Sequence, residues 1–72
     1  MAKTFVKNVI RRLRFENDEM TQQALAERVG VTRQTVVAIE KEKYSPSLEV
    51  AFRIAEVFGE PLESVFSFDK GA

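Results

Sequence analysis

Residues 21–40, TQQALAERVGVTRQTVVAIE, contain two short helical patterns separated by a single glycine. Thr21 is suited to cap the first helix, because its hydroxyl can accept a hydrogen bond from a free backbone N–H group. Gly30 ends that helix, since glycine adopts the left-handed conformation without steric cost. Thr32 repeats the cap before a second helix over about residues 33–40. The stretch therefore predicts two helices joined by a tight turn.

Apolar side chains in this stretch recur at helical spacing and are suited to hold the two helices together. Ala26 is small enough to let the helices approach closely. Met20 and Leu25 have the positions of a hydrophobic staple, in which the residue before the cap packs against the fourth helical residue. Val31 and Val36 repeat this arrangement in the second helix. The remaining core candidates are Val29 and Ile39.

The sequence before residue 21 predicts one more helix, from about Thr4, its N-cap, to about Phe15. Residues 41–46 are expected to form a loop, because the proline that ends them cannot continue a helix. No alternating pattern long enough to predict a strand is present. The helix predicted before residue 21 is indicated by an apolar stripe at steps of three and four residues, formed by Val6, Val9, Ile10 and Leu13.

The sequence after the loop predicts two further helices. Ser47 is suited to cap the first of them, and Gly59 closes it. Pro61 at a first-turn position begins a short fifth helix over residues 62–66. We expect residues 67–72 to be frayed apart from Phe68.

Composition limits the kinds of protein that this chain can be. Seventy-two residues suffice for one domain, which we place at residues 1–72. Cysteine and histidine are both absent, so no disulfide framework, zinc site or other cofactor is expected. The same absence removes the common general bases and thiol nucleophiles, and we expect no enzymatic activity. With no signal peptide and no membrane-spanning apolar run, the expected location is cytoplasmic.

Charge is distributed unevenly along the chain, although the formal net charge is zero. Residues 1–43 carry nine Lys and Arg against six Asp and Glu, whereas residues 44–72 carry two against five. A basic half is typical of a surface that meets nucleic-acid phosphates. Scattered charge on a solvated surface explains the same count, so charge alone leaves both interpretations open.

The stretch 21–40 resembles the bihelical unit of the phage repressor and Cro family, also called the xenobiotic-response-element type. The resemblance covers about residues 4–66, and its one departure is a slightly long connection from Phe15 to Met20. It implies an all-α fold, a compact five-helix, lambda-repressor-like DNA-binding domain that contains a helix-turn-helix. It also implies sequence-specific binding of double-stranded DNA by a transcriptional regulator, more specifically a repressor.

In this family the first two turns of the second motif helix lie in the major groove. The resemblance therefore implies that Arg33, Gln34, Val37 and Ala38 contact bases. Arg33 is suited to guanine and Gln34 to adenine, because each can form two hydrogen bonds with that base. Val37 is suited to a thymine methyl group, but a partly buried Val37 is an equally open interpretation.

Other residues are expected to contact phosphates or to support the motif. A helix N-terminus offers free N–H groups to phosphate, and lysines add charge without reading sequence. The resemblance also implies an ion pair between Arg14 and Glu40, which makes Arg14 a structural residue. For Lys41 and Lys43 a solvated loop is the alternative. The candidates for phosphate contact are Thr21, Gln22, Thr32, Thr35, Lys41 and Lys43.

Regulators of this type usually bind as homodimers, because one recognition helix contacts too few base pairs to select a site. We expect a C-terminal interface, with a core role for Val65 and Phe66 as the alternative. A small-molecule ligand is not expected, since five short helices leave little room for a pocket. The competing hypothesis is an antitoxin-like or protein-interaction module in which the motif is mainly scaffold. The interface candidates are Leu62, Val65, Phe66 and Phe68.

Overall fold

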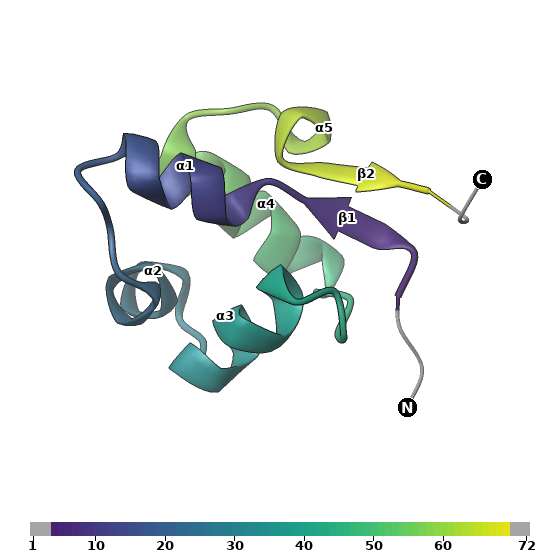
Figure 1. Ribbon diagram of the computed structural model, residues 1–72, viewed down its shortest axis with the longest axis horizontal. Coiled ribbons are helices and arrows are strands. Elements are labelled where there is room, and N and C mark those ends of the chain that lie inside the picture. Colours follow the sequence, from purple (N-terminus) through teal and green to yellow (C-terminus); the bar gives the residue numbers. More distant parts are fainter. Residues whose placement is uncertain (1–3, 70–72) are drawn as a thin grey trace.

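The computed structural model describes residues 4–69, and within them the chain forms five helices and two short strands. Figure 1 shows α1 to α4 grouped around one core, with the two strands side by side at one edge of the molecule. The expected five-helix architecture is confirmed, and a two-stranded antiparallel sheet is added to it. In chain order the elements are β1 (Val6–Asn8), α1 (Ile10–Glu16), α2 (Gln22–Val29), α3 (Arg33–Glu40), α4 (Leu48–Phe58), α5 (Leu62–Val65) and β2 (Phe66–Phe68).

The helices of the motif begin and end where the cap residues predict. The Thr21 hydroxyl accepts a hydrogen bond of 3.0 Å from the Ala24 N–H group. The Thr32 hydroxyl accepts one of 3.2 Å from Thr35, at the start of α3. Between the helices Gly30 has φ 90°, a left-handed conformation that the other residue types rarely adopt. The turn between α2 and α3 is therefore fixed by local chemistry.

One hydrophobic core joins the motif to the other helices. It is made largely of aliphatic side chains from α1 to α4, and no polar side chain within residues 4–69 is fully buried. Met20 and Val31, the predicted staple residues, are partly buried and pack against this core. Within the same residues no helix is long and apolar enough to cross a bilayer. The largest fully buried side chains are Ile10, Leu25, Val29, Val36, Ile39, Ile54 and Val65.

The predicted first helix is wrong over its N-terminal half. Residues 6–8 form β1, and α1 begins only at Ile10. Val6 pairs with Phe68 in an antiparallel register, so this segment obtains its partners from the far end of the chain. Thr4 caps no helix, and its hydroxyl accepts a hydrogen bond of 3.1 Å from Val6. The helical stripe was misleading because strand pairing over such a distance leaves no local signal.

The prediction for the last helix and the tail also needs correction. Helix α5 ends at Val65, one residue early, and Pro61 is its N-cap and not a first-turn residue. Ser67 is not frayed, because it belongs to β2 and pairs with β1. Phe68, which the sequence analysis excepts from fraying, is the last residue of the same strand. Residues 70–72 lie outside the described part of the chain.

The connection between α1 and α2 contains strained backbone. Asp18 and Glu19 have φ of 60° and 53°, values at which an L side chain is crowded by its own backbone. We predict that Glu19→Gly raises the free energy of unfolding by up to about 1 kcal/mol, because relief of this crowding outweighs the extra freedom of the unfolded chain. Urea unfolding measures the change. The matched control is Glu27→Gly within α2, which should lower stability by about 1 kcal/mol; equal losses for both variants would contradict the prediction.

Candidate nucleic-acid interface

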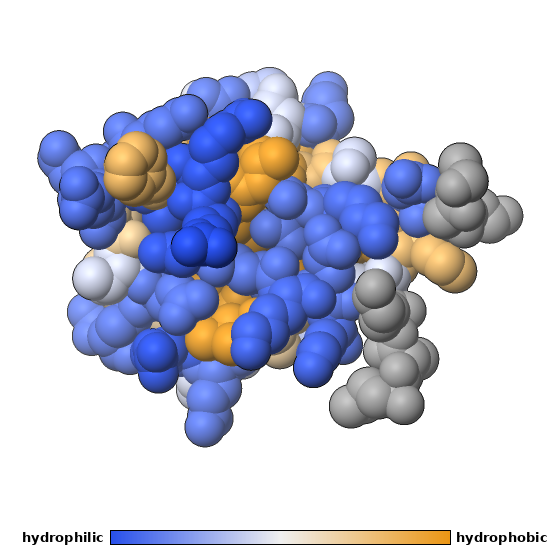
Figure 2. Space-filling view, in the orientation of Figure 1, coloured by the Kyte–Doolittle hydropathy of each residue, from blue (hydrophilic) through white to orange (hydrophobic). Residues whose placement is uncertain are grey.

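Helix α3 exposes one side to solvent and packs the other into the core. Arg33 and Gln34, in its first turn, are both exposed. Val37 and Ala38, one turn later, are half-buried. Of the two interpretations of Val37, the partly buried one is therefore correct. Figure 2 shows a mainly hydrophilic surface over this helix, with one small apolar patch. The side that faces the core carries Val36 and Ile39.

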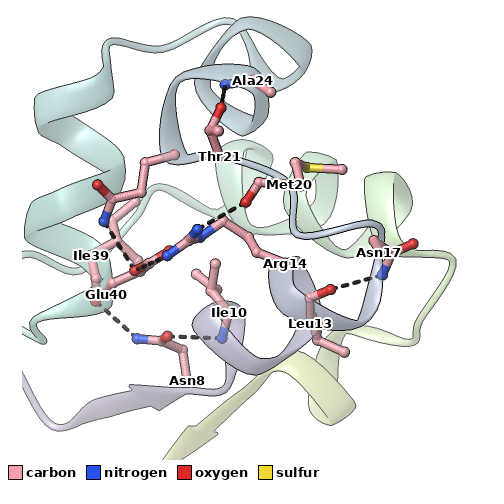
Figure 3. A network of polar contacts seen from close by, with 11 residues as sticks. Asn8, Ile10, Leu13, Arg14, Asn17, Met20, Thr21, Ala24, Ile39 and Glu40 are labelled. Carbon is pink, nitrogen blue, oxygen red and sulfur yellow. Dashed lines mark hydrogen bonds and ion pairs between the residues drawn. The ribbon is translucent and has the colours of Figure 1, made fainter.

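An ion pair holds the end of α3 against α1. The Arg14 Nε atom lies 2.6 Å from one oxygen of Glu40, and its Nη2 atom lies 3.1 Å from the other. The Arg14 Nη1 atom also donates to the Met20 carbonyl at 2.9 Å. Figure 3 shows the guanidinium between the two acceptors. The pair implied by the family resemblance is thus present, and its side chains are only 15% and 9% exposed.

The start of α2 is drawn into the same network. Gln22 donates from its Nε2 atom to the Glu40 carboxylate at 3.2 Å, so this side chain already has a protein partner. Thr21 likewise uses its hydroxyl as the helix cap. The first backbone N–H groups of a helix have no carbonyl partner within it, and in α2 the Thr21 hydroxyl satisfies that of Ala24. A phosphate contact at this end therefore depends on backbone groups more than on these two side chains.

A polar cleft of about 610 Å³ lies between α1, the start of α2 and the ends of α3. Arg11, Arg33 and Lys41 line it together with Thr21 and Gln22. Glu19 also lines the cleft, as do the paired Arg14 and Glu40. Cationic side chains outnumber carboxylates by four to two beside a helix N-terminus, which suits a phosphate group. Arg11 is not among the contact residues that the sequence predicts. It could have been found from its spacing, because a residue three positions before Arg14 lies on the same face of the helix.

The other candidates for phosphate contact lie at the two ends of α3. Thr32 and Thr35 share a hydrogen bond of 3.0 Å between their hydroxyls beside the first turn. Lys41 and Lys43 are exposed beyond the last turn. Between them Glu42 has φ 61°, and the Lys43 N–H group donates back to the Ala38 carbonyl at 3.0 Å. The left-handed residue and this hydrogen bond end α3 and satisfy one of its last carbonyl groups.

Asn8 connects β1 to the C-terminal end of α3, a role with no signal in the sequence. Its Nδ2 atom donates to the Ile39 carbonyl at 2.8 Å, and its Oδ1 atom accepts from the Ile10 N–H group at 3.1 Å. Figure 3 shows Asn8 between these two partners. Lys7 adds an ion pair of 3.3 Å with Glu42. The strand therefore supports the end of α3 that follows the exposed face.

We predict that Asn8→Asp lowers the free energy of unfolding by about 1 to 2 kcal/mol, because the donor is lost and a carboxylate faces the Ile39 carbonyl. Denaturant titration measures this change. Asn17→Asp is the matched control, since Asn17 donates to the Leu13 carbonyl at the same 2.8 Å but is exposed. A loss at Asn17 as large as that at Asn8 would show that the position of Asn8 has no special role.

The four C-terminal interface candidates do not form one surface. Val65 and Phe66 are 1% and 9% exposed and belong to the core, which corrects their assignment to an interface. Pairing with β1 turns Phe66 inward. Leu62 is half-buried, and Phe68 is 68% exposed and packs edge-to-face against Phe5, with 6.2 Å between ring centroids. Only Leu62 and Phe68 have surface to offer a partner.

Comparison with known proteins gives matches along most of the chain. A family model described as Helix-turn-helix matches residues 10–65. An uncharacterised helix-turn-helix-type transcriptional regulator of Archaeoglobus fulgidus is 55% identical over 71% of this chain and 72% of its own length. YgzD of Bacillus subtilis, described in the same words, is 48% identical over 85% of this chain and 91% of its own length. A crystal structure from Bacteroides fragilis, of a protein described as DNA-binding, matches 86% of this chain and 98% of its own chain. Its TM-score is 0.74 at 24% sequence identity, so the two proteins share the fold.

Proposed function

Because the chain belongs to the helix-turn-helix family of the repressor and Cro type, we propose that it acts by placing the first two turns of α3 in the major groove of a specific DNA site. It is a DNA-binding transcriptional regulator. The observation that carries the proposal is the exposed first turn of α3 on a helix whose other end is anchored by Arg14 and Glu40. In this proposal residues 1–72 act as one cytoplasmic DNA-binding domain, as a repressor and without catalysis of its own.

Base recognition is assigned to the exposed side of α3. Arg33 donates two hydrogen bonds to a guanine, and Gln34 pairs with an adenine through its amide. Both side chains are exposed and free to extend into the groove. Val37 and Ala38 are half-buried and offer only their outer atoms, which suits contact with a thymine methyl group. Specificity thus depends mainly on Arg33 and Gln34.

Phosphate contacts are assigned to the two flanks of this helix. On one flank the cleft with Arg11 and Lys41 faces the start of α2, where backbone N–H groups suit a phosphate. Lys43, exposed beyond the last turn of α3, supplies further charge. These contacts fix the position of the protein on DNA but carry no sequence information. The hydroxyls of Thr21, Thr32 and Thr35 and the amide of Gln22 complete the set in this proposal.

Selection of bound sites from a random DNA pool, followed by salt titration of the selected duplex, tests the proposed function. The proposal predicts enrichment of two related half-sites about one helical turn apart, roughly 34 Å, because two copies bind together. It also predicts a steep loss of affinity with salt, since bound phosphates release counterions. Absence of binding to random or genomic fragments at low salt would overturn it and would favour the antitoxin-like interaction module.

A further inference from the structure

Glu42 stands between two lysines of the proposed phosphate contacts, in a backbone conformation that its side chain disfavours. Its φ of 61° lies in the left-handed region, where a residue with a Cβ atom is crowded by its own backbone. Glycine adopts this conformation without that cost. Strained residues of this kind gather at functional sites, because the surrounding structure must hold them in place. Lys41 and Lys43 on either side are exposed, whereas Glu42 is half-buried.

Three contacts hold Glu42 in this conformation. Its N–H group donates to the Ile39 carbonyl at 2.9 Å and so closes a turn at the end of α3. Its own carbonyl accepts from the Thr4 N–H group at 3.2 Å. Its carboxylate pairs with the Lys7 Nζ atom at 3.3 Å, and these two side chains are 27% and 35% exposed. Two of the three partners thus lie in β1 or just before it.

The strand that holds Glu42 is itself fixed on more than one side. Lys7 stands opposite Ser67 in the antiparallel sheet, so its backbone is paired with β2. The Asn8 side chain donates to the Ile39 carbonyl, which is the same group that accepts from Glu42. The left-handed turn after α3 is therefore fastened to the sheet and does not depend on the loop alone.

The negative charge of Glu42 makes its direction important. A carboxylate beside phosphate-binding lysines would repel DNA if it were directed to the same side. Here it is tied to Lys7 instead. We propose that Glu42 is a positioning residue for DNA binding. Its contact with Lys7 keeps the carboxylate away from the phosphates, fixes the turn, and so holds Lys41 and Lys43 in place for their contacts. The inference rests on the proposed function, which includes those contacts.

Binding of the selected duplex by variants at position 42, over a range of salt concentrations, tests the proposal. Glu42→Gly removes a negative charge, so charge alone predicts tighter binding. The proposal predicts the reverse, because a freed turn no longer holds the lysines. At about 0.1 M salt the affinity should fall roughly fivefold, and the dependence of log affinity on log salt should fall by about one. Glu42→Gln has the same net charge as Glu42→Gly but keeps an oxygen that accepts from Lys7, and should recover most of the lost affinity.

Asp18→Gly is the matched control, since Asp18 also has a left-handed backbone, with φ 60°, and is exposed between α1 and α2. This variant loses the same charge and the same strain, and should not weaken binding. Circular dichroism verifies that each variant is folded at the temperature of the titration. Three results would each overturn the proposal: wild-type or tighter binding by Glu42→Gly, equal losses in Glu42→Gly and Glu42→Gln, or equal losses in Glu42→Gly and Asp18→Gly.

Chemical modification of lysines separates this inference from the proposed function. Reductive methylation, measured by mass spectrometry, reports whether a saturating amount of the duplex protects Lys41 and Lys43. Both should be protected in the wild type, and in Glu42→Gly the protection should be lost although the duplex is still bound. Equal protection in the two proteins would overturn the inference and leave the proposed function intact. Absence of protection in the wild type would overturn the proposed phosphate contacts, and the inference with them.

Discussion

Arg14→Met is expected to lower the free energy of unfolding by about 3 kcal/mol, because it leaves the Glu40 carboxylate poorly compensated at a site that is 9% exposed. The Met20 carbonyl loses its 2.9 Å donor in the same variant. For a domain of this size the melting temperature should fall by at least about 10 °C. Calorimetry and urea unfolding measure the two quantities. DNA affinity should fall with them, since the end of α3 is no longer held.

Two controls separate the ion pair from a general effect of charge. Glu16→Gln breaks the pair of Arg12 and Glu16, whose side chains are 64% and 56% exposed, and should cost less than about 0.5 kcal/mol. Adding Glu40→Met to Arg14→Met should recover most of the lost stability, because an apolar pair needs no compensation. A double variant as unstable as the single one would show that the guanidinium acts through packing and not through charge.

Gln34→Ala is expected to abolish the preference for one base pair in each half-site, at a cost of about 1 to 3 kcal/mol in binding to the best site. The exposed amide of Gln34 has no hydrogen bond to another side chain within residues 4–69, so its removal should leave the fold unchanged. Fluorescence anisotropy against every single-base variant of the selected duplex measures the change. Arg33→Ala should act in the same way at a different base pair.

Lys43→Ala is the matched control for these base contacts. It should weaken every duplex by a similar factor and reduce the dependence of log affinity on log salt by about one. The preference for each base should stay as in the wild type. If Gln34→Ala and Lys43→Ala changed all duplexes equally, the division between base and phosphate contacts would be wrong.

The motif could be predicted from sequence because its determinants are local. Thr21, Gly30 and Thr32 act within four residues along the chain, and the structure places both caps and the turn as expected. Ser47 and Gly59 bound α4 by the same chemistry. Such interactions are decided by a residue and its near neighbours, so the sequence contains all the information that they need.

The sheet could not be predicted, because its partners stand some sixty residues apart. Val6 fits an apolar helical stripe, yet it pairs with Phe68 and becomes part of a strand. The same pairing buries Phe66 and places Asn8 where it meets the Ile39 carbonyl. A helical period and a short strand are indistinguishable in so few residues, and tertiary contacts decide between them. The contact of Asn8 with the Ile39 carbonyl depends on this strand pairing, so the sequence could not predict it either.

The proposed function requires the exposed first turns of α3 to contact DNA. The natural chain contains no cysteine, so one introduced thiol reports on one position. Alkylation rates of Gln34→Cys and Phe15→Cys should be measured with and without a saturating amount of the selected duplex. We expect DNA to slow alkylation at position 34 at least tenfold and to leave position 15 unchanged. Equal rates at position 34 with and without bound DNA would show that α3 does not contact the duplex there.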